Sequence, residues 1–309
     1  MDRAATATAT ATAETSDQFR HRVRIFRSSR TAKLARAPGR LLYSGMAVAA
    51  CRMFKTSMSQ TARTFWGDAM RVIIPEPGSV ALLRYGFVDE GLTSIVLRLV
   101  KPGMIFFDVG AHYGYFSLLA AYLVGSAGQV HAFDPSPHTF EVLAANTAGK
   151  PNVTINNIAL YSHQATLSLM DFGIEYSEFN SLAAGRLDAQ TRGRLQPKQI
   201  EVAADSLDNY CRARGVAPDF IKLDAEGAEF PILQGMSQLL RTRRPLITLE
   251  VGTDVHDSEG GHADCTRLLL EAGYSPYAWH GGAIVPHEPR AEYVHDNLLF
   301  VPKERSLTE

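Results

Sequence analysis

Three groups of acidic residues and glycines carry the side chains that could do chemistry in this chain of 309 residues. The first group is Asp108-Val-Gly-Ala-His-Tyr-Gly-Tyr-Phe-Ser117, where an apolar run ends in a carboxylate and a glycine-rich turn follows. Glycines let the backbone approach a ligand closely, and the start of the next helix favours anionic groups. A carboxylate there can hold an ammonium group. The segment therefore favours an amino-acid-like ligand with both charges, although an ordinary strand-to-helix turn has a similar composition.

A second carboxylate, Asp134, ends the next apolar run after the one that contains Asp108. At a strand end it can accept two hydrogen bonds from ribose hydroxyls. Its alternative role is to cap the following helix, but Ser136 already offers an N-cap side chain and Pro137 fits the first turn. Both segments together predict a nucleotide cofactor. They leave its type open, although His112 replaces the middle glycine of the dinucleotide pattern.

The third group lies in 218–229, where Asp224, Glu226 and Glu229 follow Lys222 within a short stretch. Crowded carboxylates shift one another's protonation equilibria, as functional sites often do. Glu226 and Glu229 could instead only favour the first turn of the next helix. For Asp224, at a predicted strand end, we favour a chemical role.

Alternating strand and helix patterns position these groups. Apolar runs predict strands at 104–109, 129–134, 153–159, 165–170, 220–224, 246–251, 274–279 and 298–301, and helical patterns separate most of them. This order indicates an α/β fold with a doubly wound, mostly parallel sheet, whose ligands bind at the carboxyl ends of the strands. The polar segment 172–197 is long for a loop, and we expect either a lid or a disordered insertion.

Four blocks in order resemble the FkbM-type methyltransferase family, a branch of the seven-stranded, Rossmann-like class I enzymes that use S-adenosylmethionine. The blocks are DVGAHYGYFS at 108–117, FDPSPHTFEVLAANT at 133–147, NIAL at 157–160 and PDFIKLDAEGAEFPILQGM at 218–236. The resemblance covers roughly 74–303. One departure is His112, where the family usually has asparagine; histidine can also donate a hydrogen bond, but it is larger and can titrate.

The resemblance implies a site for S-adenosylmethionine. Asp108, Gly110 and Gly114 would hold the methionine end, and Asp134 the ribose. Asn157 and Ala159 would lie near the adenine, and Asp224 would face the reacting centre. The expected cofactor-binding set is Asp108, Gly110, Ala111, His112, Gly114, Tyr115, Asp134, Ser136, Asn157, Ala159 and Asp224.

The expected reaction is in-line transfer of a methyl group to a hydroxyl, a weak nucleophile that benefits from proton removal. Candidate bases are Asp224, Glu226, Glu250 and His256, and their spacing does not rank them. Asp224 and Glu250 could instead hold Mg²⁺, but we favour a site without a metal. The family resemblance suggests a sugar, glycolipid or secondary metabolite as acceptor. Rival readings are a nicotinamide-dependent oxidoreductase, a non-catalytic cofactor-binding module and a nucleic-acid methyltransferase.

Charge and composition divide the chain further. Nine of its Lys and Arg lie in residues 1–40 with three acidic residues, whereas the net charge of the whole chain is −1. The acidic remainder disfavours a nucleic-acid groove. Three widely spaced cysteines suit a reducing compartment, which favours the cytoplasm, and no apolar run is long enough for a membrane span. We expect a disordered tail at 1–17, a basic, weakly helical extension at 18–73, the methyltransferase domain at 74–303 and a short tail at 304–309. The oligomeric state is not readable.

Overall fold

The computed structural model describes residues 2–174, 177, 180, 182, 196–252, 260–290, 292–293 and 295–307. The chain divides into two compact units, Met1–Thr93 and Ser94–Glu309. The division therefore falls later than the boundary expected before residue 74.

The first unit holds three helices, a hairpin and a further helix. These are α1 (Asp2–Arg27), α2 (Arg30–Arg36), α3 (Pro38–Phe54), the antiparallel strands β1 (Met58–Arg63) and β2 (Ala69–Ile74), and α4 (Pro77–Tyr85). Helix α1 begins at Asp2, within the segment 1–17 that we expected to be a disordered tail, and the disorder of that segment stays a prediction. Its alanines have the highest helix propensity of any residue, which the low-complexity pattern conceals. The rings of Phe19, Phe65 and Phe87 form the aromatic centre of this unit.

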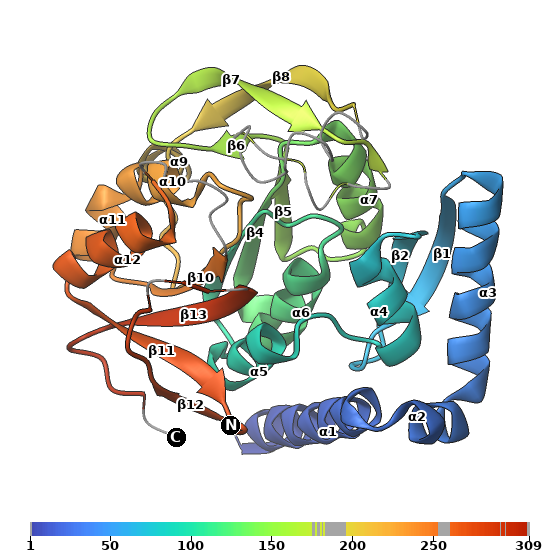
Figure 1. Ribbon diagram of the computed structural model, residues 1–309. Helices are drawn as coiled ribbons and strands as arrows, with labels where there is room; N and C mark the ends of the chain where they lie inside the picture. Colours follow the sequence, from blue (N-terminus) through green and yellow to red (C-terminus); the bar gives the residue numbers. More distant parts are fainter. Residues whose placement is uncertain are drawn as a thin grey trace. The chain divides into compact units, whose positions relative to one another are not determined.

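An eight-stranded sheet forms the second unit, in the order β12-β11-β13-β10-β9-β3-β4-β5 (Figure 1). Its strands are β3 (Ile105–Val109), β4 (Gln129–Phe133), β5 (Val153–Asn156), β9 (Phe220–Leu223), β10 (Leu246–Gly252), β11 (Tyr274–His280), β12 (Ala283–Pro286) and β13 (His295–Pro302). From β5 to β10 all neighbours are parallel, and β13 pairs antiparallel with β10 and β11. The expected doubly wound, mostly parallel sheet is confirmed. Strand β12 is an addition at the edge, where Gly281 and Gly282, both with positive φ, close a hairpin.

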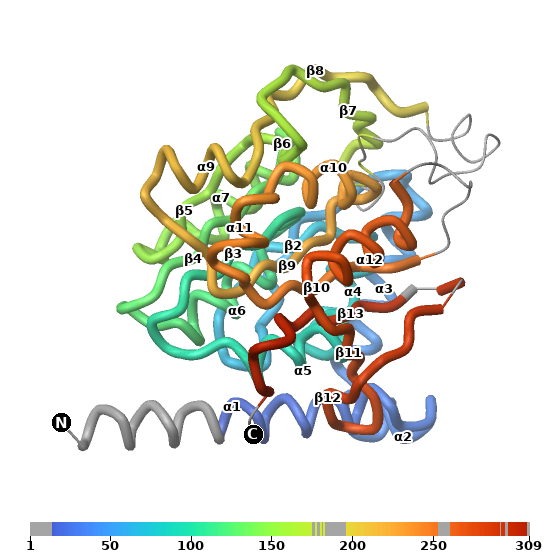
Figure 2. The backbone as a smooth tube through the Cα atoms, turned by 90° about the vertical axis from the view of Figure 1, so that its left-hand side faces the viewer, coloured from blue at the N-terminus to red at the C-terminus, as the bar shows by residue number. Residues whose placement is uncertain are grey.

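Three further strands form a separate sheet in the order β6-β8-β7: β6 (Ala159–Leu160), β7 (Ala165–Asp171) and β8 (Lys198–Asp205). The predicted strand 153–159 was wrong in its length, since it breaks after Asn156 and Ala159 joins this second sheet. Strand β8 was missed because its first half is mostly exposed and polar. The small sheet lies beyond the carboxyl end of β5, as both backbone views show (Figures 1 and 2).

Helices cover both faces of the large sheet. Right-handed crossovers place α6 (Tyr115–Val124) and α7 (Pro137–Thr147) on one face. The other face is covered by α9 (Leu207–Arg214), α10 (Glu229–Gln234), α11 (Ser237–Thr242) and α12 (His262–Glu271); α5 (Glu90–Leu99) precedes β3.

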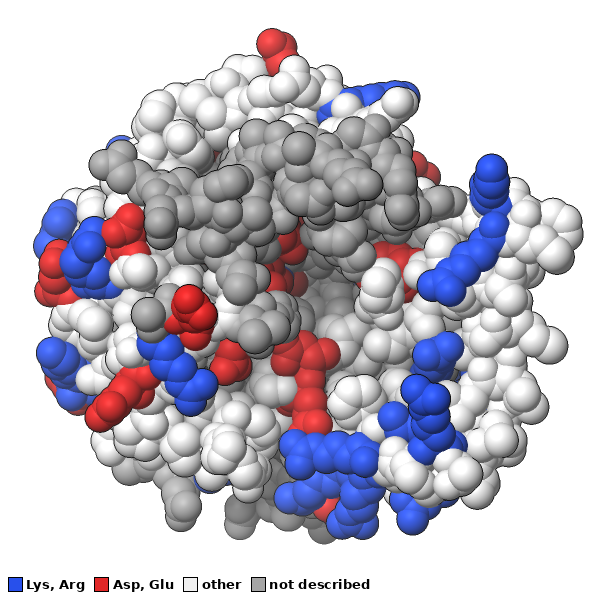
Figure 3. Space-filling view, in the orientation of Figure 1, with Lys and Arg blue, Asp and Glu red and all other residues white. Residues whose placement is uncertain are grey.

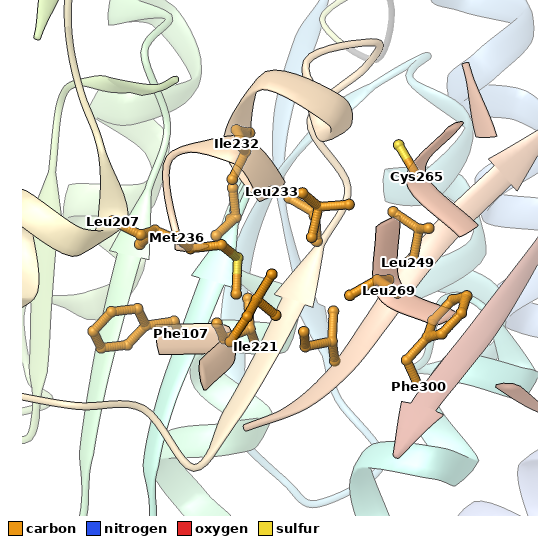
Figure 4. Close-up of a cluster of buried hydrophobic side chains, with 14 of the residues drawn as sticks. Phe107, Leu207, Ile221, Ile232, Leu233, Met236, Leu249, Cys265, Leu269 and Phe300 are labelled. Carbon is orange, nitrogen blue, oxygen red and sulfur yellow. The ribbon is translucent and has the colours of Figure 1, made fainter. Parts of the chain in front are cut away.

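The core lies between the sheet and the second group of helices. Strand residues such as Phe107, Ile221 and Leu249 meet helix residues such as Ile232 and Leu269, all essentially without solvent exposure (Figure 4).

The helix predicted at 231–241 is divided into α10 and α11. The break occurs at Gly235, where a side-chain Cβ would lie 2.2 Å from the carbonyl oxygen of Tyr161. A second chain segment thus occupies the space that a side chain at this position would need. Periodicity alone carries no information about that neighbour.

The strand order reverses between β3 and β9. From β3 the chain proceeds to β4 and β5 on one side, whereas β9 and β10 lie on the other. In such sheets ligands bind in the crevice outside the carboxyl ends of the strands at this switch point. The residues that follow Val109 and Leu223 therefore define where a site is expected. Within the described part of the chain, none of the helices has the length and apolar character needed to cross a bilayer.

Candidate functional site

The turns after β3 and β9 touch at Gly110 and Asp224. Gly110 has φ +70°, and a Cβ built on it would lie 1.7 Å from the carbonyl oxygen of Asp224. Its amide donates to the carbonyl of Phe133 at the end of β4 (3.1 Å). Only glycine allows this approach, so the glycine-rich turn is fixed against both neighbouring strands. Gly114, at φ +88°, serves packing instead, because its Cβ would meet Leu143 of α7 at 2.6 Å.

Lys222 stands beneath this contact, buried at 3% exposure. Its ammonium donates to the carbonyl of Gly110 (2.7 Å) and lies 3.5 Å from Asp108 and 3.2 Å from Asp224. Burial disfavours the charged form, but Asp224, Asp108 and Glu250 outweigh it and raise the pKa of Lys222. A buried cation thus holds two strand-end carboxylates and the glycine turn together. The sequence analysis named Lys222 beside the third group of carboxylates but assigned it no role.

Asp108 is buried completely. One of its oxygens, Oδ2, accepts from the Ser117 hydroxyl (2.6 Å), and Oδ1 has no hydrogen bond to any residue that the structure describes. Asp108 therefore organises the start of α6 and the position of Lys222. Direct contact with a ligand ammonium would need this buried oxygen to become accessible.

Asp134 ends β4 and is 6% exposed. It accepts hydrogen bonds from the amides of His112 (2.8 Å) and Ser136 (3.1 Å) and from the Thr139 hydroxyl. Burial raises the pKa of Asp134 to about 6, although the hydrogen bonds from Thr139, His112 and Ser136 act in the opposite direction. These three donors fill most of the acceptor positions of a carboxylate, which has about four. Ser136 occupies the N-cap position of α7, as expected, but its side chain makes no capping hydrogen bond within the described residues. Asp134 instead accepts from the Ser136 amide and the Thr139 hydroxyl.

The Ser136 hydroxyl is buried and has no hydrogen-bond partner in the described part of the chain. Asn157, after β5, is exposed, and its amide donates to the carbonyl of Asp134 (2.9 Å). Ser136, Asn157 and Asp134 thus adjoin one another at the strand ends.

Ala159 and Ala111 point into apolar cores, with Ala159 packed in the small sheet and Ala111 against α7. Tyr115 is 5% exposed at the start of α6. Any contact of the two alanines with a nucleotide would come from their backbones.

His112 takes a positive φ of 52° in the turn between Gly110 and Gly114. Its ring stacks on Tyr113, and its Nε2 lies 2.7 Å from the Ser177 hydroxyl. The side chain at the family's usual asparagine position is therefore engaged with the segment that follows β7.

Three carboxylates gather at the ends of β9 and β10. Oxygen atoms of Asp224, Glu226 and Glu250 lie within 4.8 Å of one another, and all three side chains are partly exposed. Burial, together with Glu250 and Glu229, raises the pKa of Asp224 to about 7, and Lys222 opposes this rise. The arrangement could accept a proton or bind a cation.

Glu229 has a structural role. Its carboxylate accepts from the amides of Ala225 (2.7 Å) and Gly227 (2.9 Å) and so closes the loop after β9. Within that loop Glu226 has φ 50°, a conformation uncommon for residues other than glycine. The two hydrogen bonds of Glu229, to the amides on either side of Glu226, hold the Glu226 backbone in this conformation.

Some predicted residues cannot be placed. His256 lies outside the described residues, as does most of the expected lid at 172–197, including Tyr176, Phe179 and Ser181. Asn180 is described, and its Oδ1 accepts from the amide of Phe172 (2.8 Å).

Comparison with known proteins identifies the family of this chain. The model of the methyltransferase FkbM domain matches residues 108–276, more than half of the chain. The 31-O-demethyl-FK506 methyltransferase FkbM of Streptomyces tacrolimicus is 26% identical over 204 residues, which are 58% of this chain and 75% of that protein. The hexuronic acid methyltransferase AglP of Haloferax volcanii is 25% identical over 189 residues, 60% of this chain and 70% of that protein.

Solved structures are more distant. An FkbM methyltransferase from Methylobacillus flagellatus aligns with a TM-score of 0.39 and 15% identity over 64% of this chain, and this chain spans 43% of that one. A SAM-dependent O-methyltransferase from Thermotoga maritima aligns with a TM-score of 0.38 and 14% identity, over 82% of each chain. The match of the family model, over the segment that contains Gly110, Asp134 and Asp224, is decisive: the chain belongs to the FkbM methyltransferase family.

Proposed function

We propose that this methyltransferase takes its methyl group from S-adenosylmethionine and transfers it to a hydroxyl of a sugar, a glycolipid or a secondary metabolite. One observation carries the proposal: the glycine bend at Gly110 packs on Asp224 at the switch point of the sheet, beside a cluster of partly exposed carboxylates. That crevice is where a doubly wound sheet binds its ligand.

The charge of the crevice supports this cofactor over a dinucleotide. Asp224, Glu226 and Glu250 border it, and buried Lys222 offsets part of their charge. A cationic sulfonium with an ammonium group is attracted by such a field, whereas a pyrophosphate is repelled. The nicotinamide alternative is therefore disfavoured by electrostatics as well as by the missing middle glycine.

Different residues of the crevice suit different parts of the cofactor. The Ser136 hydroxyl, which is buried without a partner among the described residues, and the exposed Asn157 adjoin Asp134 and offer polar groups to a ribose and a base. For Asp134 to bind a ribose diol, one of its present donors must be exchanged for a ligand hydroxyl. We assign the ribose end to these residues and the methionine end to the turn 110–114.

The bound cofactor would supply an electrophilic methyl group, and this chain's residues would align the acceptor and receive its proton. Asp224 is our first choice for the base, because a pKa raised to about 7 lets it accept a proton near neutral pH. Glu226 and Glu250 adjoin it and are the alternatives, as is His256. Asp224, Glu226 and Glu250 also have the oxygen ligands that Mg²⁺ prefers, but no step here needs an ion.

The acceptor class rests on relatives. The names of the two curated proteins describe a demethylated FK506 and a hexuronic acid as the molecules that they methylate. The first name places the missing methyl group on an oxygen, and a hexuronic acid is a sugar acid with hydroxyl groups, which supports hydroxyl transfer here. The three free, buried cysteines suit a reducing compartment and support a cytoplasmic location.

The test uses methyl-labelled cofactor. The full chain is incubated with it and with extracts of sugars, glycolipids and small metabolites, and products are separated by mass spectrometry. We expect a labelled product heavier than its acceptor by one methylene, formed by the wild type and not by Asp224→Asn. If label enters no small molecule or glycolipid, or enters only nucleic acid, this assignment of the acceptor fails.

A further inference from the structure

The first unit contains a basic pocket that methyl transfer does not use. It lies between α1 and the connection from α2 to α3, with a volume of about 670 Å³, and its lining includes Asp17, His21, Arg22, Arg36 and Arg40. The pocket is therefore lined by basic groups from three helices.

Two arginines of this pocket, Arg22 and Arg40, lie close enough for their like charges to act on each other. Arg40 has a buried Nη1 with no hydrogen-bond partner among the described residues. Burial and the nearby charge of Arg40 both lower the pKa of Arg22. The acidic residue in the lining, Asp17, pairs with Arg20 (2.8 Å). Partly buried like charges with an unsatisfied guanidinium donor favour binding of an anion, and a phosphate matches the guanidinium fork.

The surrounding sequence extends this basic character. Residues 18–67 contain eleven Lys and Arg and no Asp or Glu. Figure 3 shows Lys and Arg side chains gathered over α1 to α3. The unit thus presents a surface complementary to many negative charges, beyond a single phosphate.

One face of α3 is apolar and exposed. Its inner residues Ser44, Ala47 and Cys51 are buried. Its outer face carries large exposed apolar side chains at helical spacing: Leu42 (59% exposed), Tyr43 (46%), Met46 (67%), Met53 (71%) and Phe54 (70%). A helix with an apolar outer face and flanking arginines has the character of segments that lie in a membrane interface.

We propose that the first unit binds an anionic lipid surface, with a lipid phosphate in the pocket of Arg22 and Arg40 and the outer face of α3 in the interfacial layer. The apolar face selects this source of phosphate, because a soluble phosphate or a nucleic acid would leave Met46, Met53 and Phe54 in water. The proposal is independent of the methyl-transfer assignment, since it involves none of the residues at the sheet.

The experiment is vesicle sedimentation of the full chain. Vesicles of phosphatidylcholine alone are compared with vesicles that also contain phosphatidylglycerol. We expect binding to the anionic vesicles only, weakened by added salt. Arg22→Ala with Arg40→Ala should reduce partitioning about 25-fold, since each basic residue near the surface contributes about fivefold. Met46→Glu should reduce it at least about tenfold.

Matched variants separate this surface from general charge and folding. Arg241→Glu and Leu270→Glu change an exposed arginine and an exposed leucine of the second unit, and neither should alter partitioning. The pair Arg22→Lys and Arg40→Lys keeps the charge and should retain most binding. Each variant's thermal unfolding midpoint is measured to show that it is folded.

Four results would overturn the proposal. Two are seen with vesicles: equal binding to both vesicle types, and binding that the arginine-to-alanine pair leaves unchanged. The other two need an absence of vesicle binding: calorimetric binding of inorganic phosphate that depends on Arg22 and Arg40, or RNA binding that the same variants weaken. A dimer that Met46→Glu dissociates, with no vesicle binding, would likewise assign the face of α3 to a second copy of the chain.

Discussion

Replacing Gly110 by alanine should separate the turns after β3 and β9. Gly110 has φ +70°, and the new Cβ would lie 1.7 Å from the Asp224 carbonyl oxygen and 2.9 Å from its carbonyl carbon. Real Cβ contacts do not fall below 3.0 Å, so the two turns must part by more than 1 Å. The same movement would displace Lys222, which donates to the Gly110 carbonyl.

The magnitude follows from two costs. A left-handed conformation costs alanine about 1–2 kcal/mol, and forcing an extra carbon into packed backbone costs about 1–3 kcal/mol. We expect Gly110→Ala to lower the free energy of unfolding by about 2–5 kcal/mol. A displacement of this size at a reacting centre should reduce methyl transfer at least about 100-fold.

The control is Gly281→Ala, in the β11–β12 hairpin. Gly281 has φ +61° and nothing within 4 Å of its built Cβ, so it carries the backbone cost without the clash. Urea unfolding gives the stability of both variants, and calorimetry gives their affinity for S-adenosylhomocysteine. Equal stability losses for the two variants, with unchanged affinity in Gly110→Ala, would refute the close approach that we describe.

Three further predictions concern the charges of the site. Lys222→Met should lower the free energy of unfolding by about 3–5 kcal/mol, because it leaves Asp108 and Asp224 without their buried cation. Adding Asp108→Asn should recover part of this loss in the same urea assay. A loss below about 1 kcal/mol for Lys222→Met would contradict the prediction. Affinity for S-adenosylhomocysteine should fall as the pH drops below about 6, because Asp134, with a pKa of about 6, gains a proton there and only its ionised form accepts the ribose hydroxyls. Calorimetry at about pH 5 to 8 checks this. If Asp134→Asn leaves the pH dependence unchanged, Asp134 is excluded as its cause. Asp224→Asn should reduce transfer at least about 100-fold while changing cofactor affinity much less, and unchanged single-turnover rates would remove Asp224 as the base.

The pattern of strands and helices was readable because the buried strands are mostly apolar runs with a carboxylate at or next to their ends. Met104 to Val109 and Phe220 to Asp224 show this, and the alternation of such runs with helical patterns predicted the mostly parallel sheet. The carboxylates Asp108 and Asp224 at these strand ends both lie beside Lys222, because parallel strands share one carboxyl edge.

What the sequence could not give depends on contacts between distant segments. Gly235 looks like any residue in a helical pattern, yet the helix is divided there and the Tyr161 carbonyl lies where a side chain would be. Ser136 takes the expected N-cap position of α7, but its side chain makes no capping hydrogen bond within the described residues, and the Asp134 carboxylate accepts from the Ser136 amide and Thr139 instead. Lys222 appeared as one charge in a crowded segment, and its central position emerges only when β3 and β9 lie side by side.

The central claim is that the crevice where β3 and β9 end binds an adenosyl sulfonium cofactor. Calorimetric titration of the folded full chain with S-adenosylmethionine, S-adenosylhomocysteine and NAD⁺ tests it most directly. We predict saturable heat at one site per chain for the first two ligands, lost in Gly110→Ala, and none for NAD⁺. Heat with NAD⁺ alone, or with none of the three, would contradict the claim.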